Sequence, residues 1–111
     1  MSNKYILIGQ QPVPEADVIA WARWFENAGD QRTVCRTTVG DADVSTVFLA
    51  LDHRFSGDGP PILWETMIFG GRYDGWQARH TSREEAEGYH HKIVEALRTD
   101  DKVFFRAKEE V

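Results

Sequence analysis

Two strand-like runs, each apolar on both of its faces, constrain this chain more than any other feature. They are Asp43–Leu51 and Ile62–Phe69, and a loop rich in glycine and proline, Asp52–Pro61, separates them. Apolar side chains on both faces are typical of a strand that lies inside a sheet and is covered on both sides. The sequence therefore predicts a sheet with these runs at its centre, and a second apolar sheet face that something must cover.

Shorter strand-like segments complete the predicted sheet. Arg32–Val39 is rich in threonine and valine and leads into a tight turn at Gly40-Asp41. Trp76–His80 is a short strand that follows a second turn, Gly70–Gly75. Tyr5–Ile8 is β-branched and aromatic and predicts a short edge strand.

The first predicted helix covers Glu15–Ala28. Pro12 and Pro14 exclude a central strand and suit a helix start, with Pro14 near the first helical position. Gly29 is a suitable residue to follow the last turn.

The second predicted helix begins at Ser82, which forms a capping box with Glu85, and ends near Thr99. Val103–Phe105 is a last apolar patch, either a docking strand or a tail that packs back on the domain. Together these segments predict a single domain over residues 1–111. Its class is α+β, an antiparallel sheet of three to five strands with two helices packed on one face. The termini or another chain would then cover the other face.

Composition excludes several classes of function. The 111 residues are 41% hydrophobic and 28% charged, which is an ordinary globular balance. The formal net charge of -5 disfavours nucleic-acid binding, and no apolar run is long enough to span a membrane. A single cysteine, Cys35, excludes an intrachain disulfide and fits a reducing, cytoplasmic compartment. No recognised metal-binding or cofactor-binding spacing is present, so we expect neither group.

Two polar residues interrupt apolar patterns and are candidates for buried polar groups. His90 lies at the centre of the second helix's apolar stripe, and a buried, hydrogen-bonded histidine is favoured there over a ligand. Glu65 interrupts the run Ile62–Phe69, and a buried carboxylate needs a partner. Arg36 and His80 are the expected partners on neighbouring strands.

The candidate binding surface combines the loop after the central strand with exposed aromatic side chains. Strand ends that open into loops often carry functional side chains, and aromatic residues are enriched where proteins meet. The candidate residues are Trp24, Asp52, His53, Arg54, Phe55, Asp58, Tyr73 and Trp76. An alternative is a small metal-assisted or acid/base enzyme, which requires Asp52, His53, Glu65 and His80 to converge in one cleft.

Two long segments resemble a known family. They run from Val44 through Leu51-Asp52-His53-Arg54-Phe55, and from Gly59-Pro60-Pro61 to Trp64-Glu65-Thr66-Met67-Ile68-Phe69-Gly70-Gly71. Further similarity covers Ala22–Glu26 and Thr81–Glu87. In these motifs the chain resembles a widespread family of small uncharacterised tailed-phage and prophage proteins. It departs from the family pattern at Tyr89-His90-His91, where one histidine is expected.

The resemblance implies a phage-type accessory protein that acts in the cytoplasm of a bacterial host. Such proteins commonly bind host or defence components, so we expect a protein partner or a homodimer, with catalysis less favoured. A minor virion or assembly component is the other alternative. The resemblance implies no catalytic residue in this chain.

Overall fold

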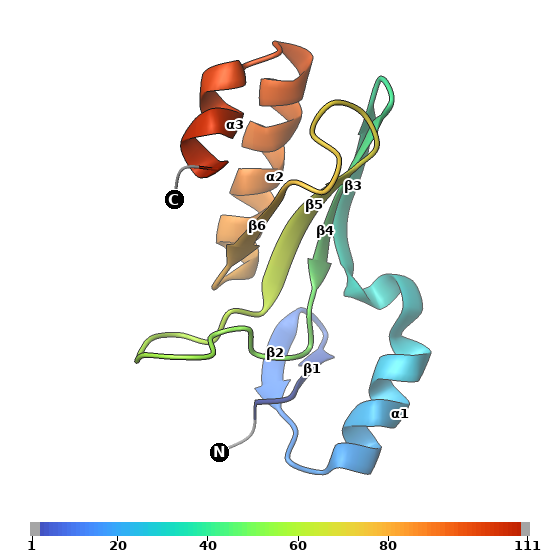
Figure 1. Ribbon diagram of the computed structural model, residues 1–111. Helices are drawn as coiled ribbons and strands as arrows, with labels where there is room; N and C mark the ends of the chain where they lie inside the picture. Colours follow the sequence, from blue (N-terminus) through green and yellow to red (C-terminus); the bar gives the residue numbers. More distant parts are fainter. Residues whose placement is uncertain (1–2, 110–111) are drawn as a thin grey trace.

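The sheet at the centre of the domain is a four-stranded antiparallel meander. The computed structural model describes residues 3–109 and orders the strands β3-β4-β5-β6 (Figure 1). Their bounds are Thr33–Val39 for β3, Ala42–Phe48 for β4, Trp64–Phe69 for β5 and Gln77–His80 for β6. The predicted α+β class is confirmed. The strand Asp43–Leu51 is shorter than predicted, since the chain leaves the sheet after Phe48.

The two faces of the sheet differ. One face, which we call the inner face, buries side chains in strict alternation along β4, where every second residue from Ala42 to Phe48 is buried. The opposite, outer face is mostly polar, with Phe69 as its exposed aromatic side chain at 52%. The predicted apolar second face is therefore wrong. The prediction counted the apolar residues Leu49–Leu51 as part of the strand. They lie beyond its end, and Ala50 has a φ of 64°, which is not a strand conformation.

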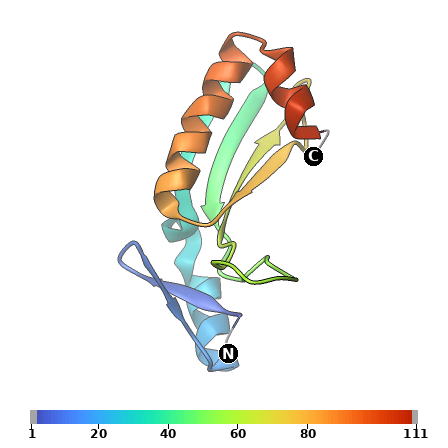
Figure 2. The ribbon, with the colours of Figure 1, turned by 90° about the vertical axis from the view of Figure 1, so that its left-hand side faces the viewer.

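Helix α2 (Arg83–Arg98) covers the inner face and contacts all four strands (Figure 2). It starts as predicted, because the Ser82 hydroxyl accepts a hydrogen bond from the Glu85 amide at 3.0 Å. Its apolar stripe buries Ile93 and Val94 against the strands.

The C-terminal segment is a helix, α3 (Lys102–Glu109), and not a strand. Asp101 accepts a hydrogen bond from the Phe104 amide in its first turn. Phe105 is fully buried and stacks on Tyr73 at 4.0 Å between ring centroids. The predicted apolar patch therefore does dock on the domain, in helical form.

A hairpin and a helix form the opposite end of the molecule. The hairpin pairs β1 (Tyr5–Ile8) with β2 (Gln11–Pro14), and α1 (Val18–Ala28) packs beside it (Figures 1 and 2). The predicted helix start is wrong, because Pro12 and Pro14 lie in a short edge strand, where a missing N–H is tolerated. Asp17 caps the helix instead, accepting from two backbone amides.

Helix α1 reaches the inner face through its aromatic side chains. The Trp24 ring meets Phe48 edge-on at 6.0 Å between centroids, and Phe48 packs in the same way on Trp64. The Trp21 indole N–H donates to the carbonyls of Tyr5 and Ala50. Of the two helices predicted on one face, α2 packs on the sheet itself, whereas α1 lies beside the hairpin and contacts the inner-face residue Phe48 through Trp24. A 3₁₀ turn, η1 (Gly29–Arg32), connects α1 to β3.

Candidate functional site

The loop between β4 and β5 is closed at its base by the Asp52 carboxylate. One oxygen, Oδ1, accepts from the amides of Arg54 and Ile62, both at 2.8 Å. The amide of His53 also donates to the Ile62 carbonyl at 2.9 Å. Residues 52–61 thus form a compact loop whose ends are joined through the backbone of Ile62, the arrangement of an Ω-loop. Asp52 has a structural task here, because its oxygen is engaged by backbone amides.

The loop is also braced inside. The Arg54 Nε donates to the Pro60 carbonyl at 2.8 Å, so the arginine spans the loop. The His53 Nδ1 lies 2.7 Å from the Leu51 carbonyl, and since a carbonyl only accepts, Nδ1 carries the proton. In the neutral form of this ring, Nε2 is then an acceptor.

Phe55 is the most exposed large apolar side chain in the described part of the protein. It is 78% exposed, with its ring 5.7 Å from that of His53. The loop that carries it projects from the end of the sheet (Figure 1). Asp58 lies exposed in the same loop. The structure therefore brings together Asp52, His53, Arg54, Phe55 and Asp58 as one surface feature.

The other predicted surface aromatics serve packing. Trp76 is 8% exposed and meets Phe105 edge-on, and Tyr73 stacks on the same ring. Trp24 is half-buried against Phe48. The exposed position predicted for Trp76 is wrong, whereas Trp24 and Tyr73 stay half-buried, because α3 and α1 supply aromatic partners that the sequence did not place next to them. Tyr73 and Trp76 follow the far end of β5, away from the loop.

The four residues of the enzymatic alternative do not converge. Glu65 lies on the outer face, where its carboxylate pairs with Arg79 across the strands at 3.0 Å. His80 points to the inner face and is 1% exposed. The expectation that Arg36 or His80 would pair with Glu65 is wrong, since register places Arg79 directly opposite. Asp52 and His53 belong to the loop described above.

A row of polar side chains crosses the inner face beneath α2, buried at its centre, half-buried at Thr37 and exposed at Glu85. Its members, in order, are Thr37, His90, Thr46, Thr66, His80 and Glu85. We call this the buried polar row. At its first end, the two ring nitrogens of His90 meet the hydroxyls of Thr37 at 2.9 Å and Thr46 at 2.8 Å. The predicted buried position of His90 agrees with its 1% exposure.

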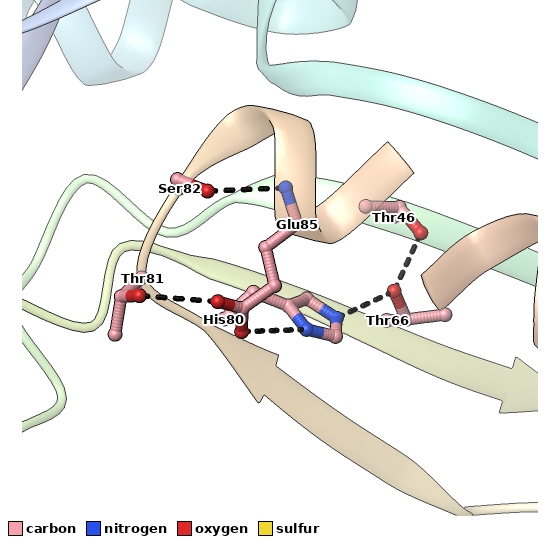
Figure 3. Close-up of polar contacts among 6 residues, drawn as sticks. All are labelled: Thr46, Thr66, His80, Thr81, Ser82 and Glu85. Atoms are coloured by element: carbon pink, nitrogen blue, oxygen red, sulfur yellow. Dashed lines mark hydrogen bonds and ion pairs between the residues drawn. The ribbon is translucent and has the colours of Figure 1, made fainter. Parts of the chain in front are cut away.

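The second half of the row runs from β4 to the first turn of α2 (Figure 3). The Thr46 and Thr66 hydroxyls are 2.6 Å apart, and Thr66 lies 3.0 Å from Nε2 of His80. The His80 Nδ1 faces the Glu85 carboxylate at 3.8 Å. That carboxylate also accepts from the Thr81 hydroxyl at 3.3 Å. The row thus links the edge strand β3 to the start of α2.

The Glu85 carboxylate gives the row a direction. Facing a carboxylate, Nδ1 of His80 carries the proton, so Nε2 accepts from the Thr66 hydroxyl. Each preceding group then donates toward Glu85, and His90 donates through Nδ1 and accepts through Nε2. The hydrogen bonds from Thr37 to Nε2 of His80 all fit this direction, and the His80 Nδ1 completes it through its charge contact with Glu85 at 3.8 Å. Burial lowers the pKa of His90 from its ordinary value of 6.5, and the neighbouring charge of His91 acts in the same direction.

The sequence interpretation missed the threonines of this row. A usable signal was present, because Thr46 and Thr66 fall on the buried phase of their strands and pair directly across them. Buried hydroxyls need partners, and the histidine in the apolar stripe of α2 is one. The row spans the helix and the sheet through a continuous set of hydrogen bonds from Thr37 to His80, so it holds α2 in register with the strands.

Within residues 3–109 there is no group of three or more His, Cys, Asp or Glu side chains that could hold a metal ion. In the same part of the chain, no helix has the length and apolar character required to cross a bilayer. Comparisons of the chain with protein-family models, curated proteins and solved structures found no match.

Proposed function

We propose that this chain is a small non-enzymatic binding protein that engages a protein partner through the loop 52–61, with Phe55 as the anchor. The observation that carries the proposal is a phenylalanine that is 78% exposed on a loop braced from within. Aromatic anchors that enter a partner's pocket contribute a large share of the energy of protein interfaces. The contact with the partner would thus depend on one projecting side chain and not on the broad apolar sheet face expected from the sequence.

The bracing of the loop supports a role in recognition. Asp52 closes the base, and Arg54 spans the interior. A loop that is already ordered loses less conformational entropy when it binds, so more of the contact energy appears as affinity. Phe69, which is also exposed, differs because it lies within the β5 ladder opposite Asp43.

The resemblance to tailed-phage and prophage proteins extends the proposal to the kind of partner. We infer that the partner is a protein of a bacterial host, such as a component of its defence. This part rests on the resemblance, whereas the loop and its anchor rest on the structure.

A matched pair of variants tests the role of the loop. Phe55→Ser and Val103→Ser each remove an exposed apolar side chain, with exposures of 78% and 75%, at different places. We expect proteins captured from bacterial lysate by the wild type to be retained by Val103→Ser and lost by Phe55→Ser. With the purified partner, calorimetry should show affinity weakened about thirtyfold by Phe55→Ser, as for an interface hot spot.

Two further observations decide the interpretation. Urea unfolding should give the same free energy for both serine variants and the wild type within about 0.5 kcal/mol, because the side chains are exposed. Asp52→Ala should weaken binding with Phe55 intact, whereas Asp58→Ala, in the exposed part of the loop, should not. Capture that is unchanged by Phe55→Ser contradicts the proposal.

A further inference from the structure

The edge strand β3 differs from the opposite edge of the sheet. It is seven residues long, whereas β6 is four, and on its far side no further strand of the described chain pairs with it (Figure 1). Exposed edges in natural proteins usually carry charged residues or proline, contain a bulge or are very short. In β3 the one charged residue is Arg36, there is no proline, and β-branched side chains make up most of the strand. The bulge lies near Val34, at the start of the strand, so Cys35–Val39 remains a regular edge.

We propose that a second copy of this chain pairs with β3 in antiparallel register centred on Thr37, giving a continuous eight-stranded sheet in a two-fold dimer. This surface is separate from the loop 52–61 and goes beyond the proposed function. The occupant is a second copy because β3 complements itself in both shape and charge.

The bulge selects the centre of the pairing. Regular pairing of β3 with β4 covers Cys35–Val39, and Thr37 is the midpoint of that segment. A two-fold axis at Thr37 places Cys35 opposite Val39 of the second copy, and pairs all five residues. A centre at Arg36 would bring the bulge into the ladder instead.

Charge selects the same centre. Centring the pairing at Arg36 would place two arginines directly opposite each other, which is unfavourable. Centring it at Thr37 places Arg36 opposite Thr38 of the second copy. That threonine donates to Asp43 at 2.6 Å within its own chain, and the same carboxylate pairs with its own Arg36 at 3.1 Å. The Arg36 of the other copy would therefore approach this carboxylate from the opposite side, one strand further on. β3 carries no acidic side chain of its own, although each chain has a net charge of -5.

The faces of the strands are also compatible. Directly opposite residues of antiparallel strands point to the same side. With the centre at Thr37, the inner-face residues Cys35 and Val39 meet each other, and the outer-face residues Arg36 and Thr38 meet each other. A slip of one strand by a single residue relative to the other would set inner against outer side chains. The guanidinium of Arg36, whose side chain is 67% exposed, pairs with Asp43 of its own chain at 3.1 Å, so this ion pair would lie beside the new interface.

Disulfide cross-linking tests the register directly. In Val39→Cys, the introduced thiol would lie opposite the native Cys35 of the second copy, within the spacing that a disulfide spans. With oxidised glutathione we expect a covalent dimer on a non-reducing gel. Thr38→Cys is the matched control, because its thiol lies on the outer face opposite Arg36 and should leave the chain uncross-linked. A folded Val39→Cys chain that stays monomeric, or equal cross-linking of both variants, overturns the proposal.

Sedimentation analysis gives a second test that does not need Val39→Cys to fold. The wild type should show a monomer–dimer equilibrium, and Arg36→Glu should weaken it about tenfold by placing like charges at both ends of the pairing. Arg23→Glu, the same charge change on exposed α1, should leave the equilibrium unchanged. A wild type that is monomeric at every concentration refutes the dimer. Phe55→Ser should dimerise normally, which separates this inference from the proposed function.

Discussion

The Thr46 hydroxyl is the central link of the buried polar row, and removing it tests whether the row stabilises the fold. Thr46→Val keeps the shape of the side chain and deletes only the hydroxyl. The His90 Nδ1–H then loses its acceptor at 2.8 Å, and Thr66 loses its partner at 2.6 Å. Thr46 and Thr66 have no solvent exposure, and His90 is only 1% exposed, so water cannot replace the missing contacts without opening the core.

The expected cost follows from these contacts. A buried donor without an acceptor costs about 1–3 kcal/mol, and the second lost hydrogen bond contributes about 1 kcal/mol. The additional methyl group of valine offsets about 1 kcal/mol through burial. We therefore expect the free energy of unfolding to fall by about 2 kcal/mol, which lowers the Tm of a chain of this size by about 8 °C.

Urea unfolding followed by circular dichroism measures the change. Thr33→Val is the matched control, because Thr33 is exposed on β3, and its replacement should change stability by no more than about 0.5 kcal/mol. The double variant Thr46→Val/Thr66→Val should cost less than the sum of the single variants, since both partners of one hydrogen bond are removed together. A loss below about 0.5 kcal/mol for Thr46→Val would refute the stabilising role of the row.

Two further predictions concern the turn after β5 and acid stability. Gly70→Ala should destabilise the fold far more than Gly75→Ala, although both glycines have a φ of +86°. An added Cβ at Gly70 would collide with the Asp41 carbonyl, whereas the space around Gly75 is open. Thermal unfolding of the two variants measures the difference. The lowered pKa of His90 means that below pH 6.5 the unfolded chain binds a proton that the folded chain does not. The free energy of unfolding should therefore be highest above pH 6.5 and fall as the pH drops below that value. Urea unfolding at pH values on both sides of 6.5 should show a smaller fall for His90→Gln than for the wild type.

Elements with local signals could be predicted from the sequence. The start of α2 depends on Ser82 and Glu85, which lie in one turn, so the pattern identified it correctly. The strand β2, which contains Pro12 and Pro14, has no such local signal. It is stabilised by pairing with Tyr5–Ile8, beside which α1 packs. Proline then predicted a helix start where the chain forms an edge strand.

The surroundings of a candidate residue could be predicted only where all its contacts lie within one short segment. The loop 52–61 contains its own bracing residues, Asp52 and Arg54, and its position after a strand marked it as a surface feature. The burial of Trp76 depends on Phe105, nearly thirty positions later in the chain, and the sequence gives no sign of that contact. Aromatic content alone therefore could not separate a binding anchor from a core residue.

Thr37 connects the buried polar row with the proposed dimer. Its hydroxyl lies on the inner side and contacts His90, while its backbone lies on the strand that would meet the second copy. Pairing uses the backbone of β3, so it leaves the hydroxyl in contact with His90. In the proposed register the two Thr37 side chains lie opposite each other, and the two polar rows meet end to end across the axis. The dimer would therefore extend the row from the Glu85 of one chain to the Glu85 of the other and enclose the end that a single chain leaves half-exposed.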